Sequence, residues 1–344
     1  MARVIEPALR GGFFRDKNGQ GRAAHQSFCL VDLRATVRRM NDVVFHVPRS
    51  WLRLGGPGLH RFYLRVTEGL EARGVRFEVM ILDRDSLERT VAADDAIHVV
   101  HHGRFAHPRV RNADVAYIYP FWNFDPKGIR AFSSIGDSTF PQDRIDPDVA
   151  RPFFRRLRQR IVGQRTSRYA QPQALSDTGP ICAAVFLQSE GHRVVGETCY
   201  LDRWAMVEAT CEAIDGLVVV KAHPRDRDPG TAEALRALQA RYPHLQVSAA
   251  NIHDLIAAAD RVVTINSAVG IEAYLHRKPV VLCGQSDFHH IADVVHDAAA
   301  LRSTLARAPK RRAYDKFIWW YFADQCLDIG APDLVERFCA RCGI

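Results

Sequence analysis

The sequence predicts an α/β protein made of two doubly wound domains, each built around a parallel sheet. Its 344 residues are long for one core and comfortable for two. Apolar residues make up 47% of the chain and charged residues 25%, which is typical of a globular protein. In both halves short apolar runs alternate with stretches of helical periodicity, and this alternation favours right-handed βαβ units.

The first half, residues 1–165, is expected to form the N-terminal domain. An apolar strand over 42–50 precedes a glycine-rich stretch and a helix over 59–73. Further apolar runs predict three more strands, over 76–82, 96–102 and 113–119. A polar loop over 123–138 follows, and residues 140–177, rich in Arg, Pro, Gln and Ser, predict a connection with helical pieces.

The second half, residues 178–312, is expected to form the C-terminal domain. The predicted strands are 181–188, 217–224, 245–249, 261–265 and 278–284. The predicted helices between them are 201–214, 231–241, 252–259 and 268–276. In the remaining segment, 313–344, Phe317, Trp320 and Tyr321 have the spacing of a buried helix face, which favours core packing over sugar stacking.

Polar side chains follow four strands of the second half, at the point where each strand ends. Because the carboxyl ends of parallel strands meet at one edge of a sheet, these side chains predict a binding site there. They are Gln188, Ser189, Glu190 and His192 after the first strand, Lys221 and His223 after the second, Asn266 and Ser267 after the third, and Gln285, Asp287, His289 and His290 after the fourth.

The stretch after the third of these strands has the features of an anion site. Ser267 is a good N-cap for the helix that begins at Ala268, and a helix start offers free N–H groups and a positive dipole end. Gly270 would leave room for a phosphate, and Glu272 could accept hydrogen bonds from ribose hydroxyls. An ordinary capped helix with a packing glycine is the alternative.

The sequence VVVKAHPRD, residues 218–226, ends a buried strand in a cation and an imidazole. Lys221 and His223 are both suited to an anionic phosphate, and Pro224 ends the strand. The alternative is a loop histidine satisfied by its surroundings. The nearby helix start at Ser267 favours the phosphate interpretation.

The overall charge and the cysteines limit the partners. The net charge of +8 suits an anionic partner without choosing one. The stretch from Arg151 to Arg168 is arginine-rich and has no acidic residue, so it is either a solvated helix face or a contact for an anionic lipid or glycan. No membrane span or secretory signal is predicted, and the lone pair Cys339 and Cys342 is a weak metal signal.

Several motifs resemble bacterial capsular polysaccharide glycosyltransferases related to the Kdo transferases, which use CMP-Kdo. They are KAHP, TINSAVGIEAYLHRKPVVLCG and YDKFIWWYFADQC, with DPKGIRAFSSIGDSTF upstream. The resemblance implies a GT-B architecture, in which two Rossmann-like domains face a central cleft and a C-terminal helix crosses back onto the first domain. It also implies a donor nucleotide held by the C-terminal domain, with no metal and no cofactor.

The resemblance assigns roles to the predicted site. Lys221 and His223 would contact the CMP phosphate, while Ser267 and Glu272 would lie near the phosphate or ribose. A carboxylate must activate the acceptor hydroxyl or attack the sugar. Three carboxylates are candidates, namely Glu190, Asp137 and Asp125. The sequence departs from the family pattern after Gln188, where Glu190 is the only nearby acid.

We therefore expect a cytoplasmic enzyme that moves a sugar, Kdo from CMP-Kdo, onto a capsular or cell-surface glycan or its lipid-linked precursor. The inner membrane surface and capsule assembly proteins are further candidate partners, whereas nucleic acid is not expected. Two alternatives stay open. One is a catalytically silent GT-B scaffold that binds glycan, and the other is a sugar-nucleotide epimerase of the same fold.

Overall fold

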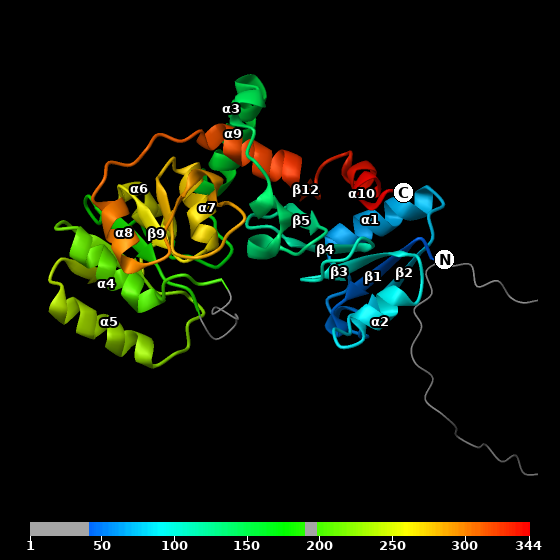
Figure 1. The fold of residues 1–344 in the computed structure, drawn as a ribbon, viewed down its shortest axis with the longest axis horizontal. Coiled ribbons are helices and arrows are strands. Elements are labelled where there is room, and N and C mark those ends of the chain that lie inside the picture. Colours follow the sequence, from blue (N-terminus) through cyan, green and yellow to red (C-terminus); the bar gives the residue numbers. More distant parts are fainter. Residues whose placement is uncertain (1–40, 190–197) are drawn as a thin grey trace, which may run out of the picture.

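A computed structural model describes residues 41–189 and 198–344. These residues form two lobes, each containing a six-stranded sheet (Figure 1). Helices α3 (Pro147–Arg158) and α9 (Tyr314–Trp319) lie between the lobes and pack against each other. The predicted fold class is confirmed.

The first sheet has the order β12-β5-β4-β3-β1-β2. Strands β1, β2, β3 and β4 are parallel to one another, whereas β5 pairs antiparallel with both β4 and the edge strand β12. The strands are β1 (Val43–Val47), β2 (Phe77–Ile81), β3 (Ile97–His101), β4 (Val110–Val115), β5 (Phe121–Asp125) and β12 (Leu327–Asp328). The helices of this lobe are α1 (Arg61–Ala72), α2 (Leu87–Ala92) and α10 (Leu334–Cys342).

The end of the chain returns to the first lobe. Strand β12 pairs with β5, and α10 packs on α1. Phe338 of α10 stacks on Phe45 of β1 with ring centroids 6.0 Å apart. Cys339 and Cys342 are buried in the same apolar cluster as free thiols. The first sheet is therefore completed by residues more than 200 positions away in the sequence.

Three elements of the first lobe differ from those predicted from the sequence. The strand predicted over 113–119 lies over 110–115, because the amide of Ala116 donates to the carbonyl of Phe121 and turns the chain into β5. Strand β5 occupies the beginning of the predicted polar loop, and α2 was not predicted.

The second sheet has the order β11-β10-β9-β6-β7-β8 and is parallel throughout. Its strands are β6 (Ala183–Phe186), β7 (Val218–Lys221), β8 (Leu245–Val247), β9 (Val262–Thr264), β10 (Val280–Leu282) and β11 (Asp293–Val294). The helices are α4 (Arg203–Ala213), α5 (Gly230–Arg241), α6 (Ile252–Ala258), α7 (Ala268–Leu275) and α8 (Ala298–Leu305).

One apolar core continues from the first lobe into the second. It contains Phe121, Phe154, Phe288, Phe317 and Tyr321, so the two sheets share buried surface. A π-helical segment, Gln159–Gly163, extends α3, and another, Trp320–Gln325, extends α9. The aromatic face of the late helix is core, as its spacing predicted.

The apolar side of the arginine-rich stretch belongs to this core. Phe154, Leu157 and Ile161 are buried, while Arg151, Arg155 and other arginines of α3 are exposed. The apolar residues that would make this stretch amphipathic toward a membrane are thus covered by protein. Over the described residues, no helix combines the length and apolar character needed to cross a bilayer.

A buried carboxylate joins the lobes. Asp287, in the loop after β10, has no exposed surface. Its Oδ1 accepts a hydrogen bond from Tyr117 (2.7 Å), and its Oδ2 accepts from Ser133 and Tyr321 (both 2.8 Å). Burial raises the pKa of Asp287, and the three hydroxyl donors oppose this rise by stabilising the charged form.

We expect Asp287→Ala to lower the free energy of unfolding by about 3 kcal/mol, because three buried hydroxyls lose their acceptor. Ser133→Ala removes one of the donors and should cost about 1 kcal/mol. Urea unfolding followed by tryptophan fluorescence measures both. Equal losses in the two variants would show that Asp287 is not the centre of this contact.

Candidate active site

A cavity of about 160 Å³ lies at the carboxyl edge of the second sheet. Strands β7, β6 and β9 are neighbours in this sheet, so the loops that follow them meet at one place. The sequence-predicted residues that line the cavity are Gln188, Ser189, Lys221, His223, Pro224, Ser267, Ala268 and Glu272. Asn266 and Gly270 do not line it.

Lys221 and His223 reach the cavity from the end of β7. Lys221 Nζ donates to the carbonyls of Ala249 (3.0 Å) and Ala250 (2.7 Å), which uses two of its three donors. Burial lowers the pKa of Lys221. The Nδ1 atom of His223 accepts from the amide of Arg225 (3.1 Å), an arrangement that makes Nε2 the protonated nitrogen of the neutral ring.

Arg203, at the start of α4, binds the turn that follows His223 through ion pairs. Arg203 is 4% exposed, and its guanidinium pairs with Asp226 (3.0 Å) and Asp228 (2.6 Å). Thr231 also donates to Asp226 (2.8 Å). These contacts fix Asp226 and Asp228, the acids that follow KAHP, in an internal network. The two acids therefore anchor the loop, whereas His223 and Arg225 line the cavity.

The start of α7 forms another wall. Ser267 caps the helix, with its Oγ accepting from the amide of Val269 (3.3 Å). Gly270 has a packing role, because a methyl group added there would lie 2.9 Å from the ring of Phe288. The prediction that Gly270 makes room for a phosphate is therefore wrong, and the alternative of a packing glycine holds.

Glu272 is the least satisfied polar group of the cavity. It is 4% exposed, and within the described chain its Oε2 has no hydrogen-bond partner. Burial raises its pKa to about 8, against a smaller opposing effect of a hydrogen bond with Ser167. Glu272 also lines a neighbouring cavity of about 360 Å³ that extends to Val115 and Tyr119 of the first lobe. A buried carboxyl with one oxygen left without a partner is suited to a hydroxyl-bearing ligand.

Gln188 and Asn266 fasten the ends of β6 and β9 to each other. The Gln188 amide donates to Asn266 Oδ1 and accepts from the Asn266 backbone amide, both at 2.8 Å. Asn266 therefore holds the ends of β6 and β9 together without lining the cavity itself. Glu190 and His192 lie outside the described residues.

The connection between the lobes supplies the last wall, which includes Ser167, Tyr169 and Gln171. The ring of Tyr169 meets that of His223 edge-on, with centroids 5.0 Å apart. The guanidinium of Arg225 lies 4.7 Å from the centroid of the same tyrosine ring.

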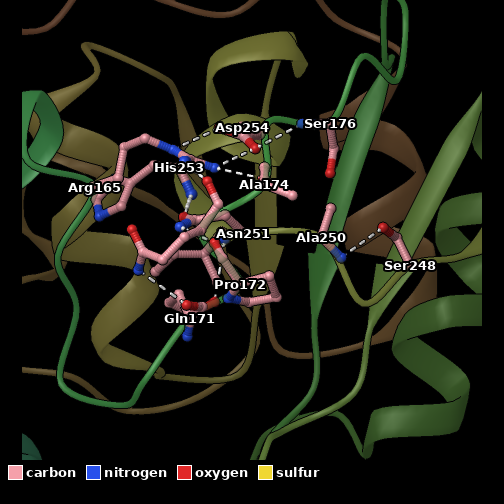
Figure 2. Close-up of polar contacts among 12 residues, drawn as sticks. Arg165, Gln171, Pro172, Ala174, Ser176, Ser248, Ala250, Asn251, His253 and Asp254 are labelled. Atoms are coloured by element: carbon pink, nitrogen blue, oxygen red, sulfur yellow. Dashed lines mark hydrogen bonds and ion pairs between the residues drawn. The ribbon is translucent and has the colours of Figure 1, made fainter.

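This connection is tied to the start of α6 (Figure 2). Arg165 forms an ion pair with Asp254 (2.6 Å) and donates to the carbonyls of Gln173 and Ala174. Asn251 donates to the carbonyl of Pro172 (3.0 Å). The carbonyl of Ala250 in the same view is an acceptor for Lys221. The connection is thus part of the second lobe's site, a role that its composition did not indicate.

A larger cavity of about 620 Å³ lies between the lobes. Asp137 lines it from the first lobe, and Gln285 and His289 line it from the second. The side chain of Asp137 is 69% exposed and pairs with Lys127 (2.7 Å), whose hydrogen bond lowers the pKa of Asp137. Gln285 donates to the carbonyl of Ala131 across the interface (2.6 Å).

Asp125 does not face this cavity. It is 4% exposed, and one carboxylate oxygen accepts from the amides of Lys127 and Gly128. The other oxygen accepts from both the amide and the hydroxyl of Ser134. Because both oxygens are occupied by the loop that follows β5, Asp125 shapes that loop and is not placed to act as the catalytic carboxylate for which it was a candidate.

Part of the chain matches a known protein family. Residues 205–327 match the family model described as capsule polysaccharide biosynthesis protein. This segment includes the motifs KAHP, TINSAVGIEAYLHRKPVVLCG and YDKFIWWYFADQC. The predicted resemblance is therefore confirmed within residues 205–327. Over residues 41–189 and 198–344, no group of three or more His, Cys, Asp or Glu side chains could hold a metal ion.

One curated protein and two solved structures are similar to this chain. Protein FixF of Sinorhizobium fredii is 35% identical over 129 residues, which is 34% of this chain and 30% of FixF. The structure of the beta Kdo 2,7 transferase KpsC of Thermosulfurimonas dismutans has a TM-score of 0.54 at 13% identity and covers 88% of this chain and 98% of its own. The beta Kdo 2,4 transferase KpsC of that organism has a TM-score of 0.47 at 14% identity, with 81% and 89% covered.

The structural similarity shows the GT-B fold, and the match to the capsule polysaccharide biosynthesis family model is limited to residues 205–327. The chain spans about a third of the length of its curated relative.

We expect Glu272→Gln to stabilise the protein at alkaline pH. Because its folded-state pKa of about 8 lies above its ordinary value of 4.5, the stability that depends on the neutral form is present at low pH and is lost as pH rises through 8. The thermal unfolding midpoint should exceed that of the unaltered protein at pH 9 and match it at pH 5. Glu233→Gln, on the exposed face of α5, is the matched control. A difference that does not depend on pH would contradict the raised pKa.

Proposed function

We propose that this chain is a glycosyltransferase of capsule synthesis that moves Kdo from CMP-Kdo onto a capsular or cell-surface glycan or its lipid-linked precursor. The observation that carries the proposal is the cavity beside β6, β7 and β9, because it lies within the lobe that contains the family-matched segment. Its walls combine an imidazole, a helix start and a buried carboxyl whose Oε2 has no hydrogen-bond partner within the described chain.

In this proposal the nucleotide occupies that cavity. The phosphate lies between His223 and the start of α7, where Nε2–H, backbone amides and the helix dipole are all suited to an anion. Lys221 adds positive charge from the side of α6. Glu272 accepts from the ribose hydroxyls, which would give its Oε2 the partner that it lacks. The phosphate is neutralised by these groups without a metal ion or cofactor.

The acceptor glycan or glycolipid lies in the 620 Å³ cavity between the lobes. Asp137 faces this cavity, and Glu190 remains the other candidate for the catalytic carboxylate. The exposed arginines of α3 would meet the anionic surface of the inner membrane or the capsule assembly proteins, which would bring a lipid-linked acceptor to the protein.

Titration with nucleotides tests the donor. We expect CMP to raise the thermal unfolding midpoint and UDP to leave it nearly unchanged, because only a ligand of the folded state stabilises it. CMP release from CMP-Kdo then tests turnover. If neither cytidine nor uridine nucleotides move the midpoint, the nucleotide site is absent and the proposed function fails.

Substitution of His223 tests the phosphate contact. We expect His223→Ala to weaken CMP binding by about 1–3 kcal/mol, which is the contribution of a hydrogen bond to a charged group. Isothermal titration calorimetry measures the change, with His244→Ala, a histidine beside α4 and away from the cavity, as the matched control. Equal CMP affinity in the two variants would show that His223 does not contact the phosphate.

A further inference from the structure

Arg160 belongs to the arginine-rich stretch but points into the protein. Arg151 and Arg155, on α3 itself, are exposed, whereas Arg160 is half-buried in the π-helical segment Gln159–Gly163 that extends α3. Its side chain lines the 360 Å³ cavity between the lobes. Single π-helical turns at the end of an α-helix are frequent at functional sites. Arg160 therefore has a different environment from the arginines that face solvent.

The guanidinium of Arg160 is held in place without a carboxylate. Its Nη2 donates to the carbonyl of Tyr119 (3.1 Å), and its Cζ lies 5.7 Å from the centroid of the Phe121 ring. Among the described residues no carboxylate forms an ion pair with Arg160, and its buried Nε has no hydrogen-bond partner. Burial lowers the pKa of Arg160, and the charge of Asp328 opposes this only in part. A half-buried cation that lacks a counter-ion is suited to an anionic ligand.

The 360 Å³ cavity adjoins the cavity in which the nucleotide is proposed to bind. Ser167, Arg168 and Glu272 line both cavities, so the two share one wall. The 620 Å³ cavity shares no described lining residue with the nucleotide cavity. A group attached to the nucleotide phosphate can therefore extend into the 360 Å³ cavity without crossing a packed core.

The first lobe supplies a largely apolar wall opposite Glu272. Val115, Ile118 and Tyr119 line it, and Tyr119 is 50% exposed. A mostly apolar surface with a few fixed polar groups is the usual form of a site for a small molecule. Here the polar groups include a cation without a counter-ion and a carboxyl whose Oε2 lacks a partner within the described chain. This combination fits a ring that carries both hydroxyls and a negative charge.

We propose that the 360 Å³ cavity holds the sugar of the donor and that Arg160 binds the carboxylate of this sugar, which selects an acidic sugar over a neutral one. This inference rests on the proposed function. In CMP-Kdo the carboxylate is attached to the carbon that carries the phosphate, so the group that binds it has to lie next to the phosphate site. The wall shared by the two cavities meets this requirement.

The position of the cavity also agrees with transfer to an acceptor. Tyr117 lines the 360 Å³ cavity, Ser133 lines the 620 Å³ cavity, and both donate hydrogen bonds to Asp287. The proposed sugar site and the proposed acceptor site therefore approach each other around this carboxylate. The fork of guanidinium donors is suited to a carboxylate, which it can bind through two hydrogen bonds.

Arg160→Gln separates recognition of the sugar from recognition of the nucleotide. We expect the KM for CMP-Kdo to rise by about 10- to 100-fold, which corresponds to the loss of a hydrogen bond between charged groups, and the Kd of CMP to change by less than about twofold. CMP release from CMP-Kdo measures the KM, and isothermal titration calorimetry measures the Kd. Arg236→Gln, on the exposed face of α5, is the matched control and should leave both values unchanged.

Two further measurements distinguish binding from a structural role. Without ligand, the thermal unfolding midpoint of Arg160→Gln should equal or exceed that of the unaltered protein, because the substitution removes a half-buried charge that has no counter-ion. Arg160→Lys should have a KM between those of the unaltered protein and Arg160→Gln, since lysine keeps the charge but loses the planar fork.

A KM for CMP-Kdo that stays within about twofold in Arg160→Gln would overturn the assignment, since a charged hydrogen bond contributes far more. Equal weakening of CMP and CMP-Kdo would overturn it as well, because Arg160 would then act on the nucleotide or on the fold. In both cases the proposed function would still stand. If the unaltered protein binds no CMP, or releases none from CMP-Kdo, the proposed function itself fails and the sugar site falls with it.

Discussion

The contact between Asp287 and three hydroxyls is the constraint on which the arrangement of the two lobes depends. A carboxylate with no exposed surface is stable only when its oxygens are fully engaged, and here the donors come from a turn and a loop of the first lobe and from the late helix. Separation of the lobes at this place would leave the carboxylate and its donors without partners. The floor of the interdomain cavity is therefore fixed.

The same segment explains why the cavity is where it is. Gln285 bonds to the carbonyl of Ala131, and the ring of His290 bonds to the carbonyl of Ser138 (2.8 Å). Residues next to these contacts line the 620 Å³ cavity from both sides. The carboxyl edges of the two sheets are held facing each other, which is the geometry that a two-substrate transfer needs.

Local patterns predicted the site of the second lobe well because four of its six strands are each followed directly in sequence by polar residues. The cavity position, and the approach of Lys221, His223 and Glu272 to it, follow from the alternation of strands and helices alone. Gly270 shows the limit of this reasoning. A glycine in a helix can accommodate a ligand or a side chain, and only the position of Phe288 decides between them.

The features that the sequence analysis missed depend on contacts between distant residues. Strand β12 pairs with β5 across about 200 residues, and Asp287 meets Tyr117 across 170. No periodicity within either segment reports such a pairing. Asp114 and His102 lie 12 residues apart, and nothing in the sequence between them indicates that their side chains form a hydrogen bond. The sequence predicted a role for His223 but none for the acids of the turn that follows it. In the structure these acids, Asp226 and Asp228, form ion pairs with Arg203.

The extent of the family match can be understood from the fold. Residues 205–327 include strands β7 to β11, the late helix and the first residue of β12, which lies in the first sheet. The matched segment thus contains about half of the residues that line the 160 Å³ cavity and also Asp287 and Tyr321, which attach the second lobe to the first. It leaves out strands β1 to β5, where the acceptor would bind in the proposed function. In the proposed function the match therefore covers part of the donor site, the second-lobe wall of the acceptor cavity and the attachment between the lobes, whereas the first-lobe wall of that cavity lies outside it.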